Sequence, residues 1–249
     1  MTRIIIANWK ANPASLGEAQ ELFAAEMAAA SEFPNIKTVI CPPFVYIEEL
    51  AKLSKSNLGA QNIFWEESGP FTGEVSPEML KNLGVSHVLV GHSDRRYVMN
   101  ETDEIINKKI KATLGDDMTP VLLVGEKKKG ENKRQILSEQ LMADLNGLSG
   151  ADVEKTLFAY EPVWAISTNK NAEPDIPENT LEAINIIEGF LLENFKVETK
   201  NLCFLYGGSV TDKNVADFLS HPQISGAVIG GASLQEKEFA KILKIVSAL

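Results

Sequence analysis

The sequence contains only two cysteines, Cys41 and Cys203, among its 249 residues. Both lie in apolar runs typical of strands, and neither has the CxxC or Cys/His spacing of a zinc site or a redox motif. A disulfide framework and a metal site are therefore unsupported, and we expect two buried, reduced thiols. We expect no cofactor either.

Long hydrophobic runs are also missing. No stretch approaches the roughly 20 apolar residues that a membrane-spanning helix needs. The N-terminus lacks the basic segment followed by an apolar segment that marks a secretory signal. We therefore expect a soluble, cytoplasmic protein that has no membrane partner.

Positive charge is the third shortage, since 24 Lys and Arg against 34 Asp and Glu leave a formal net charge of -10. This balance argues against nucleic acid and anionic membranes as partners. It does not exclude a small anionic substrate, because helix N-termini and one well-placed Lys can hold a phosphate locally.

Short apolar runs alternate with longer amphipathic segments, such as Ser15 to Ala30 and Thr180 to Phe195. Strands that are apolar on both faces and separated by helices indicate a parallel sheet built from βαβ units. We predict an α/β fold, a (β/α)8 barrel that forms one domain over residues 1–249. An open doubly wound sheet is disfavoured because no GxGxxG turn follows the first strand. The eight predicted strands are Ile4–Ala7, Thr38–Ile40, Leu58–Gln61, Val88–Val90, Val121–Val124, Leu157–Tyr160, Leu202–Leu205 and Ala227–Ile229.

Polar residues and glycines gather where the predicted strands end. In a (β/α)8 barrel, the loops after the strands all lie at the face that carries the active site. Structural polar residues would scatter over both faces, so this placement predicts one functional site. The residues concerned are Asn8, Lys10, His92, Glu161, Ser209, Gly230 and Gly231.

Glu161 ends an apolar strand, and Pro162 restricts it to extended geometry. The loop that follows carries Trp164 and Ile166, which is typical of a lid that closes over a ligand. A lid would remove water from Glu161 and make its carboxylate a stronger base. The alternative is a solvated glutamate at a strand end.

A single histidine such as His92 is more often structural than catalytic. Here, however, Gly91 lets the backbone approach closely, and we expect Ser93 to cap a helix that starts at Asp94. The positive end of that helix would keep the imidazole neutral and able to donate to substrate oxygens. We interpret His87 and His221 as structural or surface residues.

The loops after the seventh and eighth strands contain Gly207-Gly208-Ser209 and Gly230-Gly231. Glycines let a backbone come close to a ligand, and these two loops commonly bind phosphate in barrels of this kind. Either pair alone is as consistent with an ordinary turn, but the two pairs at adjacent strand ends favour a phosphate site.

Seven short motifs follow one another in a fixed order along the chain. They are Asn8-Trp9-Lys10, Gly59-Ala60-Gln61-Asn62, Phe71-Thr72-Gly73-Glu74, Gly91-His92-Ser93-Asp94-Arg95-Arg96, Val124-Gly125-Glu126, Tyr206-Gly207-Gly208-Ser209-Val210 and Gly230-Gly231-Ala232-Ser233-Leu234. Together these motifs resemble the triosephosphate isomerase family. The resemblance implies the TIM barrel, a triose phosphate substrate, a homodimer and a cytoplasmic enzyme. It also implies interconversion of dihydroxyacetone phosphate and glyceraldehyde 3-phosphate through an enediolate.

The same resemblance implies a role for each site residue. Triosephosphate isomerases pair a Glu base with a neutral His, which implies Glu161 as the base and His92 as the electrophile. Lys10 would stabilise negative charge, and Asn8 would bind a substrate oxygen. The remaining implied roles are phosphate binding by the Ser167 N-H with Ser209, Gly230 and Gly231, support of Lys10 by Asp94, and entry of Thr72 into the partner's site.

The sequence departs from the family pattern at several of these positions. Ser167 and Asn169 stand where glycine is usual, and a positive φ at Ser167 would add about 1–3 kcal/mol of strain. Asp94 is one methylene shorter than the usual Glu, and Ala11 replaces a Met expected at the subunit interface. Two other functions stay open: isomerisation of a four-carbon ketose phosphate, and phosphate binding by a non-catalytic barrel.

Overall fold

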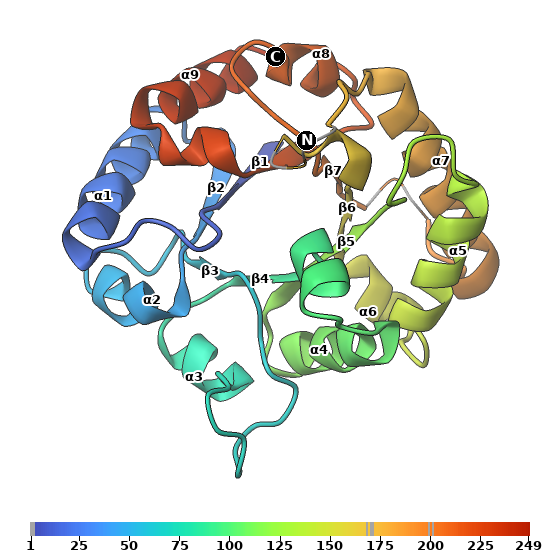
Figure 1. Cartoon of the computed structure of the whole chain (residues 1–249), viewed down its shortest axis with the longest axis horizontal. Helices are drawn as coiled ribbons and strands as arrows, with labels where there is room; N and C mark the ends of the chain where they lie inside the picture. The colour runs from blue at the N-terminus through green and yellow to red at the C-terminus, as the bar shows by residue number, and fades with distance from the viewer. Residues whose placement is uncertain (1–2, 168, 170–171, 199, 201) are drawn as a thin grey trace.

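The computed structural model describes residues 3–167, 169, 172–198, 200 and 202–249. An eight-stranded parallel sheet forms the centre of the molecule, in the order β2-β1-β8-β7-β6-β5-β4-β3. An isolated parallel bridge between Ile40 and Leu58 joins the two ends of this order, so the sheet closes on itself (Figure 1). The strands are β1 (Arg3–Asn8), β2 (Ile36–Cys41), β3 (Gly59–Ala60), β4 (His87–Val90), β5 (Thr119–Val124), β6 (Leu157–Tyr160), β7 (Phe204–Tyr206) and β8 (Gly226–Ile229).

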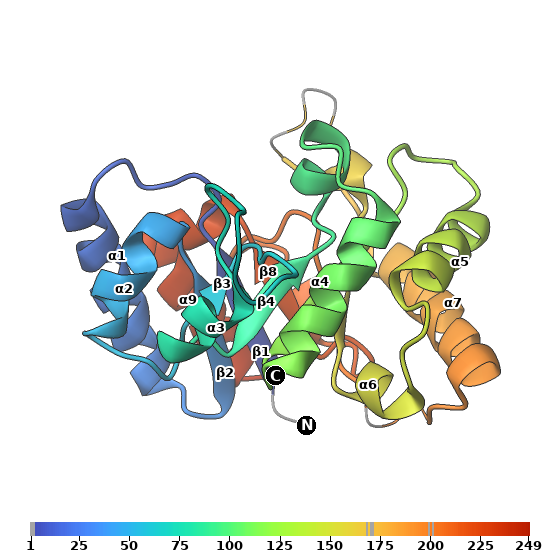
Figure 2. The ribbon, with the colours of Figure 1, turned by 90° about the horizontal axis from the view of Figure 1, so that it is seen from below.

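The helices surround the sheet, as both ribbon views show (Figures 1 and 2). The predicted (β/α)8 barrel is therefore confirmed. The helices are α1 (Leu16–Glu32), α2 (Phe44–Ala51), α3 (Pro77–Asn82), α4 (Asp103–Gly115), α5 (Lys133–Asp144), α6 (Gly150–Glu154), α7 (Pro177–Phe195), α8 (Val215–Leu219) and α9 (Glu236–Ser247), with short helical turns η1 (Asp94–Val98), η2 (Val163–Ala165) and η4 (Gly231–Leu234).

The strands are buried on both faces because two layers of side chains cover them. One cluster fills the barrel interior and includes Ile6, Val39, Leu123 and Val228. A larger cluster packs the outer face of the sheet against the helices. Burial of apolar side chains on both sides explains why the strands read as continuous apolar runs in the sequence.

Element boundaries follow local chemistry. Ser15 and Glu18 form a reciprocal capping box that starts α1 at Leu16, within the predicted amphipathic segment Ser15 to Ala30, and the helix continues two residues further, to Glu32. Helix α7 begins at Pro177, before the predicted start at Thr180, because proline is tolerated in the first helical turn. Strand β7 spans Phe204–Tyr206, whereas we predicted Leu202–Leu205.

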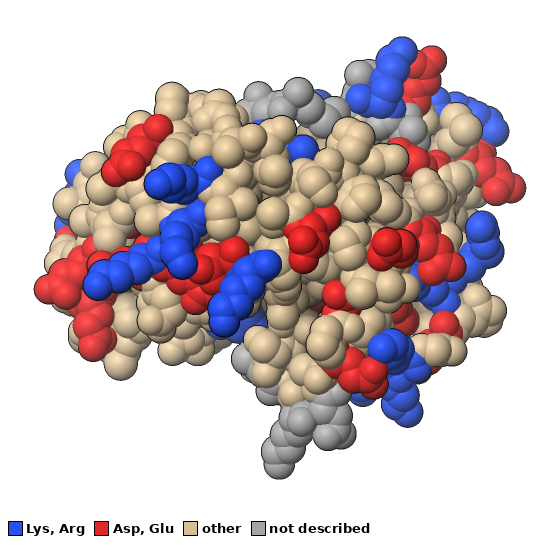
Figure 3. All heavy atoms as spheres, turned by 90° about the horizontal axis from the view of Figure 1, so that it is seen from above, with Lys and Arg blue, Asp and Glu red and all other residues tan. Residues whose placement is uncertain are grey.

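Surface features agree with the composition. Among the described residues, no helix is long and apolar enough to cross a membrane. On the face shown in Figure 3, Lys and Arg side chains lie beside Asp and Glu side chains. Cys41 is buried as predicted, but Cys203 is only partly buried, because β7 begins after it.

Candidate active site

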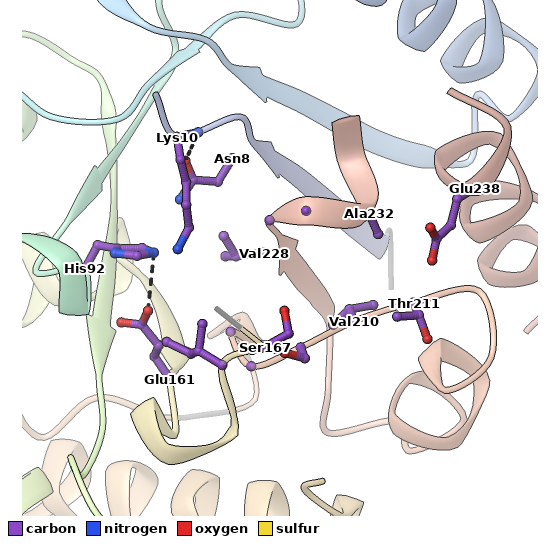
Figure 4. A pocket seen from close by; sticks show the side chains of 16 residues that line it. Asn8, Lys10, His92, Glu161, Ser167, Val210, Thr211, Val228, Ala232 and Glu238 are labelled. Atoms are coloured by element: carbon purple, nitrogen blue, oxygen red, sulfur yellow. Dashed lines mark hydrogen bonds and ion pairs between the residues drawn. The ribbon is translucent and has the colours of Figure 1, made fainter. Parts of the chain in front are cut away.

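The loops that follow the strands enclose a cavity of about 210 Å³ at one mouth of the barrel (Figure 4). The structure brings eight predicted site residues to this cavity. They come from the ends of β1, β4, β6, β7 and β8 and from the β6–α7 loop, which supports the functional face inferred from the sequence. The lining includes Asn8, Lys10, His92, Glu161, Ser167, Ser209, Gly230 and Gly231.

Glu161 follows β6 directly and is 3% exposed. Its N-H donates to the Val124 carbonyl of the neighbouring strand over 2.8 Å. Gly125 permits this approach, since a Cβ atom at Gly125 would lie 2.0 Å from the Glu161 carbonyl oxygen. The sequence therefore fixes the backbone of Glu161 tightly while its side chain points into the cavity (Figure 4).

Ser93 holds both oxygens of the Glu161 carboxylate. The Ser93 N-H donates to Oε2 over 2.9 Å, and the Ser93 hydroxyl donates to Oε1 over 2.8 Å. Our prediction that Ser93 caps the following helix was wrong, because its side chain makes no capping hydrogen bond and its backbone is itself helical. The hydroxyl binds the carboxylate instead, since a charged acceptor forms the stronger hydrogen bond.

His92 lies 8% exposed at the end of β4, and its two ring nitrogens have different partners. The Asp94 N-H donates to Nδ1 over 3.0 Å, so Nδ1 is an acceptor there and the proton of a neutral ring sits on Nε2. Nε2 lies 3.3 Å from Glu161 Oε1, as the dashed line in Figure 4 shows. A neutral imidazole that presents an N-H to the cavity can polarise a substrate oxygen.

Lys10 adopts a left-handed backbone, with φ of 54°. Its N-H donates to Asn8 Oδ1 over 3.1 Å, and its Nζ lies 3.1 Å from Asp94 Oδ2. A non-glycine residue in this conformation is uncommon and is often found at functional sites. The shorter Asp94 thus reaches Lys10 directly, and no bridging water is needed for this contact.

Side chains of Glu26 and Gln61 hold the loop that carries Lys10 through hydrogen bonds with Trp9 and with the Lys10 backbone. The Trp9 indole N-H points into the protein and lies 3.2 Å and 3.1 Å from the two carboxylate oxygens of Glu26, which is 1% exposed. Burial raises the pKa of Glu26 well above its ordinary value, although the hydrogen bond from Trp9 lowers it. The Gln61 side-chain amide donates to the Lys10 carbonyl over 2.8 Å and to the Cys41 carbonyl over 2.9 Å.

The phosphate-binding residues predicted from the sequence lie at the other end of the cavity. The Ser167 N-H donates to Ser209 Oγ over 2.7 Å, and the Ser209 hydroxyl donates to the Ala165 carbonyl over 2.9 Å. Gly230 and Gly231 precede and begin η4. Ser167 is not among the residues with positive φ, so the condition under which we predicted strain there is not met.

The base of the β6–α7 loop contains a buried cluster that we did not select as part of the site. Glu126, which is 2% exposed, accepts from the Tyr160 hydroxyl and from the Trp164 indole N-H, each over 2.8 Å. The Val124-Gly125-Glu126 motif was the available signal. The hydrogen bonds from Ser93 to the Glu161 carboxylate were likewise not predicted from the sequence.

Thr72 does not join the cavity of its own chain. It lies in the loop between β3 and α3, which projects from the barrel at the bottom of Figure 1. The loop is exposed, and Phe71 is 38% exposed. Within the described part of the chain, no group of three or more His, Cys, Asp or Glu residues could hold a metal ion.

Comparisons with known proteins agree with this geometry. The family model described as triosephosphate isomerase matches residues 3–246. A triosephosphate isomerase of Caldanaerobacter subterraneus subsp. tengcongensis is 41% identical over 247 residues, which cover 96% of this chain and 98% of the relative. The corresponding protein of Lactobacillus delbrueckii subsp. lactis is 42% identical, with 94% of each chain covered.

A solved structure is also similar to this chain over nearly its whole length. The crystal structure of triosephosphate isomerase from Bartonella henselae matches with a TM-score of 0.85 and 32% identity, covering 98% of this chain and 99% of the other. The match of the family model and the matches of these relatives extend over nearly the whole chain. This chain therefore belongs to the triosephosphate isomerase family.

Proposed function

We propose that this protein interconverts dihydroxyacetone phosphate and glyceraldehyde 3-phosphate by proton transfer through an enediolate. The convergence of Glu161, His92 and Lys10 on one small cavity is the observation that carries the proposal. The reaction needs a base beside the substrate carbons, a proton donor at the substrate oxygens and a positive charge for the intermediate. These three side chains supply one group each.

Glu161 is the base. Its carboxylate accepts hydrogen bonds from Ser93, and a turn of the side chain away from Ser93 brings it to the substrate carbon. Exclusion of water by the β6–α7 loop then favours transfer of the proton to the carboxylate. One carboxylate serves both carbons, because they are adjacent.

His92 and Lys10 act on the oxygens. The Asp94 N-H at Nδ1 leaves the proton of a neutral ring on Nε2, which faces Glu161 Oε1 at 3.3 Å and can donate to the substrate carbonyl and hydroxyl oxygens once Glu161 turns to the substrate carbon. Lys10 stabilises the charge of the enediolate, Asp94 orients Lys10, and Asn8 provides a further hydrogen bond at the same oxygens.

The phosphate binds between the loops after β7 and β8. Ser209, Gly230 and Gly231 line that end of the cavity. The Ser167 N-H completes the site once it exchanges Ser209 Oγ for a phosphate oxygen. Backbone N-H groups of this kind bind a phosphate without requiring a basic surface, which is consistent with the acidic composition.

We also propose a cytoplasmic homodimer. The exposed loop around Thr72 supports this proposal, because a projecting loop with an exposed aromatic side chain is typical of an interaction surface. Thr72 of one protomer would then reach the active site of the other. Analytical ultracentrifugation of the protein and of a Thr72→Arg variant tests this assembly, and a wild-type monomer would contradict it.

A coupled assay on the purified protein tests the reaction in both directions. We expect turnover of both triose phosphates and loss of turnover in Glu161→Ala. Turnover that persists in Glu161→Ala would contradict the assignment of the base. A higher kcat/KM with a tetrulose phosphate would favour the four-carbon alternative, and binding without turnover would favour a non-catalytic barrel.

A further inference from the structure

The guanidinium of Arg96 lies behind the loop that carries His92. Arg96 Nε donates to the Gly91 carbonyl over 2.7 Å, directly before the catalytic histidine. Its Nη2 donates to the Leu123 carbonyl over 3.3 Å, on the adjacent strand β5. The side chain is only 7% exposed, so these bonds are shielded from water and strengthened by the low local dielectric.

Gly91 and Arg96 fix each other's position. Gly91 has φ of +79°, and a Cβ atom there would lie 2.8 Å from Arg96 Nη2 and 2.9 Å from the Leu123 carbonyl oxygen. The turn therefore closes onto the guanidinium with no free space between them. Any displacement of the guanidinium moves the peptide that leads into His92.

Two carboxylates hold the guanidinium from the outside, and they differ in exposure. Asp103, at the start of α4, pairs with Nη1, and its side chain is 38% exposed. Asp144, the last residue of α5, pairs with Nη2 over 2.6 Å, and its side chain is fully buried. Asp144 also fixes α4, since its carbonyl accepts from the Asn107 side-chain amide over 2.7 Å.

The cost of burying Asp144 indicates that it is not present for stability. Its Oδ1 has no hydrogen-bond partner in the described structure, and burial raises the pKa of Asp144 to about 7 even though Arg96 lowers it. Well-packed apolar residues often serve stability better than a buried ion pair. A buried carboxylate that makes one directed contact is typical of a residue that orients its partner.

We propose that Asp144 is a positioning residue for the isomerisation, which acts through Arg96 to hold the Gly91 peptide and thereby the imidazole of His92. Removal of its charge releases one side of the guanidinium, and the loop before His92 shifts. A displacement of about 1 Å at a reacting group costs about 100-fold in rate, so a partial shift has a measurable effect. This inference rests on the proposed role of His92.

Asp144→Asn, assayed at pH 8 or above, where the Asp144 carboxyl is mostly ionised, tests the inference, because asparagine keeps the shape and removes the charge. We expect kcat to fall about tenfold or more. We expect KM to change by less than about twofold, since the phosphate end of the cavity lies on other loops. Glu139→Gln is the matched control: it removes the same charge from an exposed position on α5, away from Arg96, and we expect no change in either constant.

A double-mutant cycle separates positioning from general destabilisation. Arg96→Lys keeps a cation but loses the directed bonds to Gly91, so it should lower kcat by itself, and Asp144→Asn should add nothing further in that background. Arg96→Lys also tests the inference alone if Asp144→Asn does not fold. Hydrogen exchange of the 91–94 backbone should increase in both variants.

Several results would overturn the inference. Unchanged kcat in folded Asp144→Asn and in folded Arg96→Lys would do so. A loss in Asp144→Asn that persists undiminished in the Arg96→Lys background would exclude action through Arg96. His92→Gln distinguishes the two levels: unchanged turnover there removes the proposed role of His92, on which this inference rests, whereas lost turnover there with a normal kcat in Asp144→Asn removes only this inference.

Discussion

Ser93 binds both oxygens of the Glu161 carboxylate through its N-H and its hydroxyl, at 2.9 Å and 2.8 Å. Each carboxylate oxygen therefore accepts one hydrogen bond from Ser93. The proposed role of Glu161 as the base requires it to exchange these bonds for contacts to the substrate, so that role depends on the length and freedom of the side chain as well as on its charge.

Shortening the base tests that requirement. Glu161→Asp keeps the carboxylate but withdraws it by one methylene, roughly 1.5 Å from its present position. We expect kcat to fall about 100-fold or more with little change in KM, because proton transfer depends steeply on distance. Steady-state kinetics in both directions measure this. Ser93→Ala is the control, and a larger loss there than in Glu161→Asp would contradict the assignment.

Removal of the Lys10 charge should weaken both binding and chemistry. Lys10→Met keeps the length of the side chain and removes the ammonium that lies beside Asp94. We expect kcat/KM to fall about 100-fold or more, because a preorganised charge at a developing oxyanion is worth several kcal/mol. Asp94→Asn should change the free energy of unfolding only slightly, because the Asp94 side chain is half exposed and exposed ion pairs contribute little to stability. Near-normal kcat/KM in Lys10→Met would rule out the electrostatic role.

Lowering the pH should destabilise the barrel through His87, which is buried at the start of β4. Burial, with Lys37 nearby, lowers the pKa of His87 from 6.5 to about 3. The unfolded chain therefore binds this proton first, so stability is full above pH 6.5 and falls as the pH drops toward 3. Between pH 6.5 and 4.5 we expect a loss of about 2–3 kcal/mol from this group.

Urea denaturation of the protein and of His87→Asn across this range isolates the histidine. The variant lacks the titration, so the difference in unfolding free energy between the two proteins should shrink as the pH falls. A difference that stays constant from pH 7 to pH 4.5 would show that His87 binds its proton equally in both states.

Glu26 should have the opposite dependence. Its raised pKa means that the folded protein holds the proton more tightly than the unfolded chain, so the associated stability is full below pH 4.5 and is lost as the pH rises through the folded value. Glu26→Gln cannot ionise, yet its carbonyl still accepts from Trp9. We therefore expect the variant to gain stability relative to the wild type as the pH rises from 5 to 9, measured by denaturant unfolding. Parallel curves would contradict burial of an ionisable carboxyl.

The sequence was sufficient to predict the barrel and the loop face at which the selected polar residues lie. Alternating apolar runs and helices predicted all eight strands, and the polar residues after β1, β4 and β6 meet as expected. These inferences depend on local patterns, such as strand length and the residue that follows each strand. Boundaries were less certain where proline extended a helix, as at the start of α7.

Contacts between distant residues could not be predicted in the same way. Arg96 and Asp144 are 48 positions apart, and neither belongs to a local pattern that selects the other. Ser93 has the ordinary sequence context of a helix cap, and only the three-dimensional proximity of Glu161 redirects its hydroxyl. Glu26 lies on a helix face that is otherwise apolar, and the sequence contains no sign of its pairing with Trp9.

The closure of the barrel has a consequence for Lys10. Strands β2 and β3 meet through a single bridge at Ile40 and Leu58, so the ring is thinnest there. The Gln61 amide spans this seam and binds the carbonyls of Lys10 and Cys41 together. Opening of this seam would release the Lys10 carbonyl from the Gln61 amide and so loosen the loop that holds the Lys10 ammonium beside Asp94.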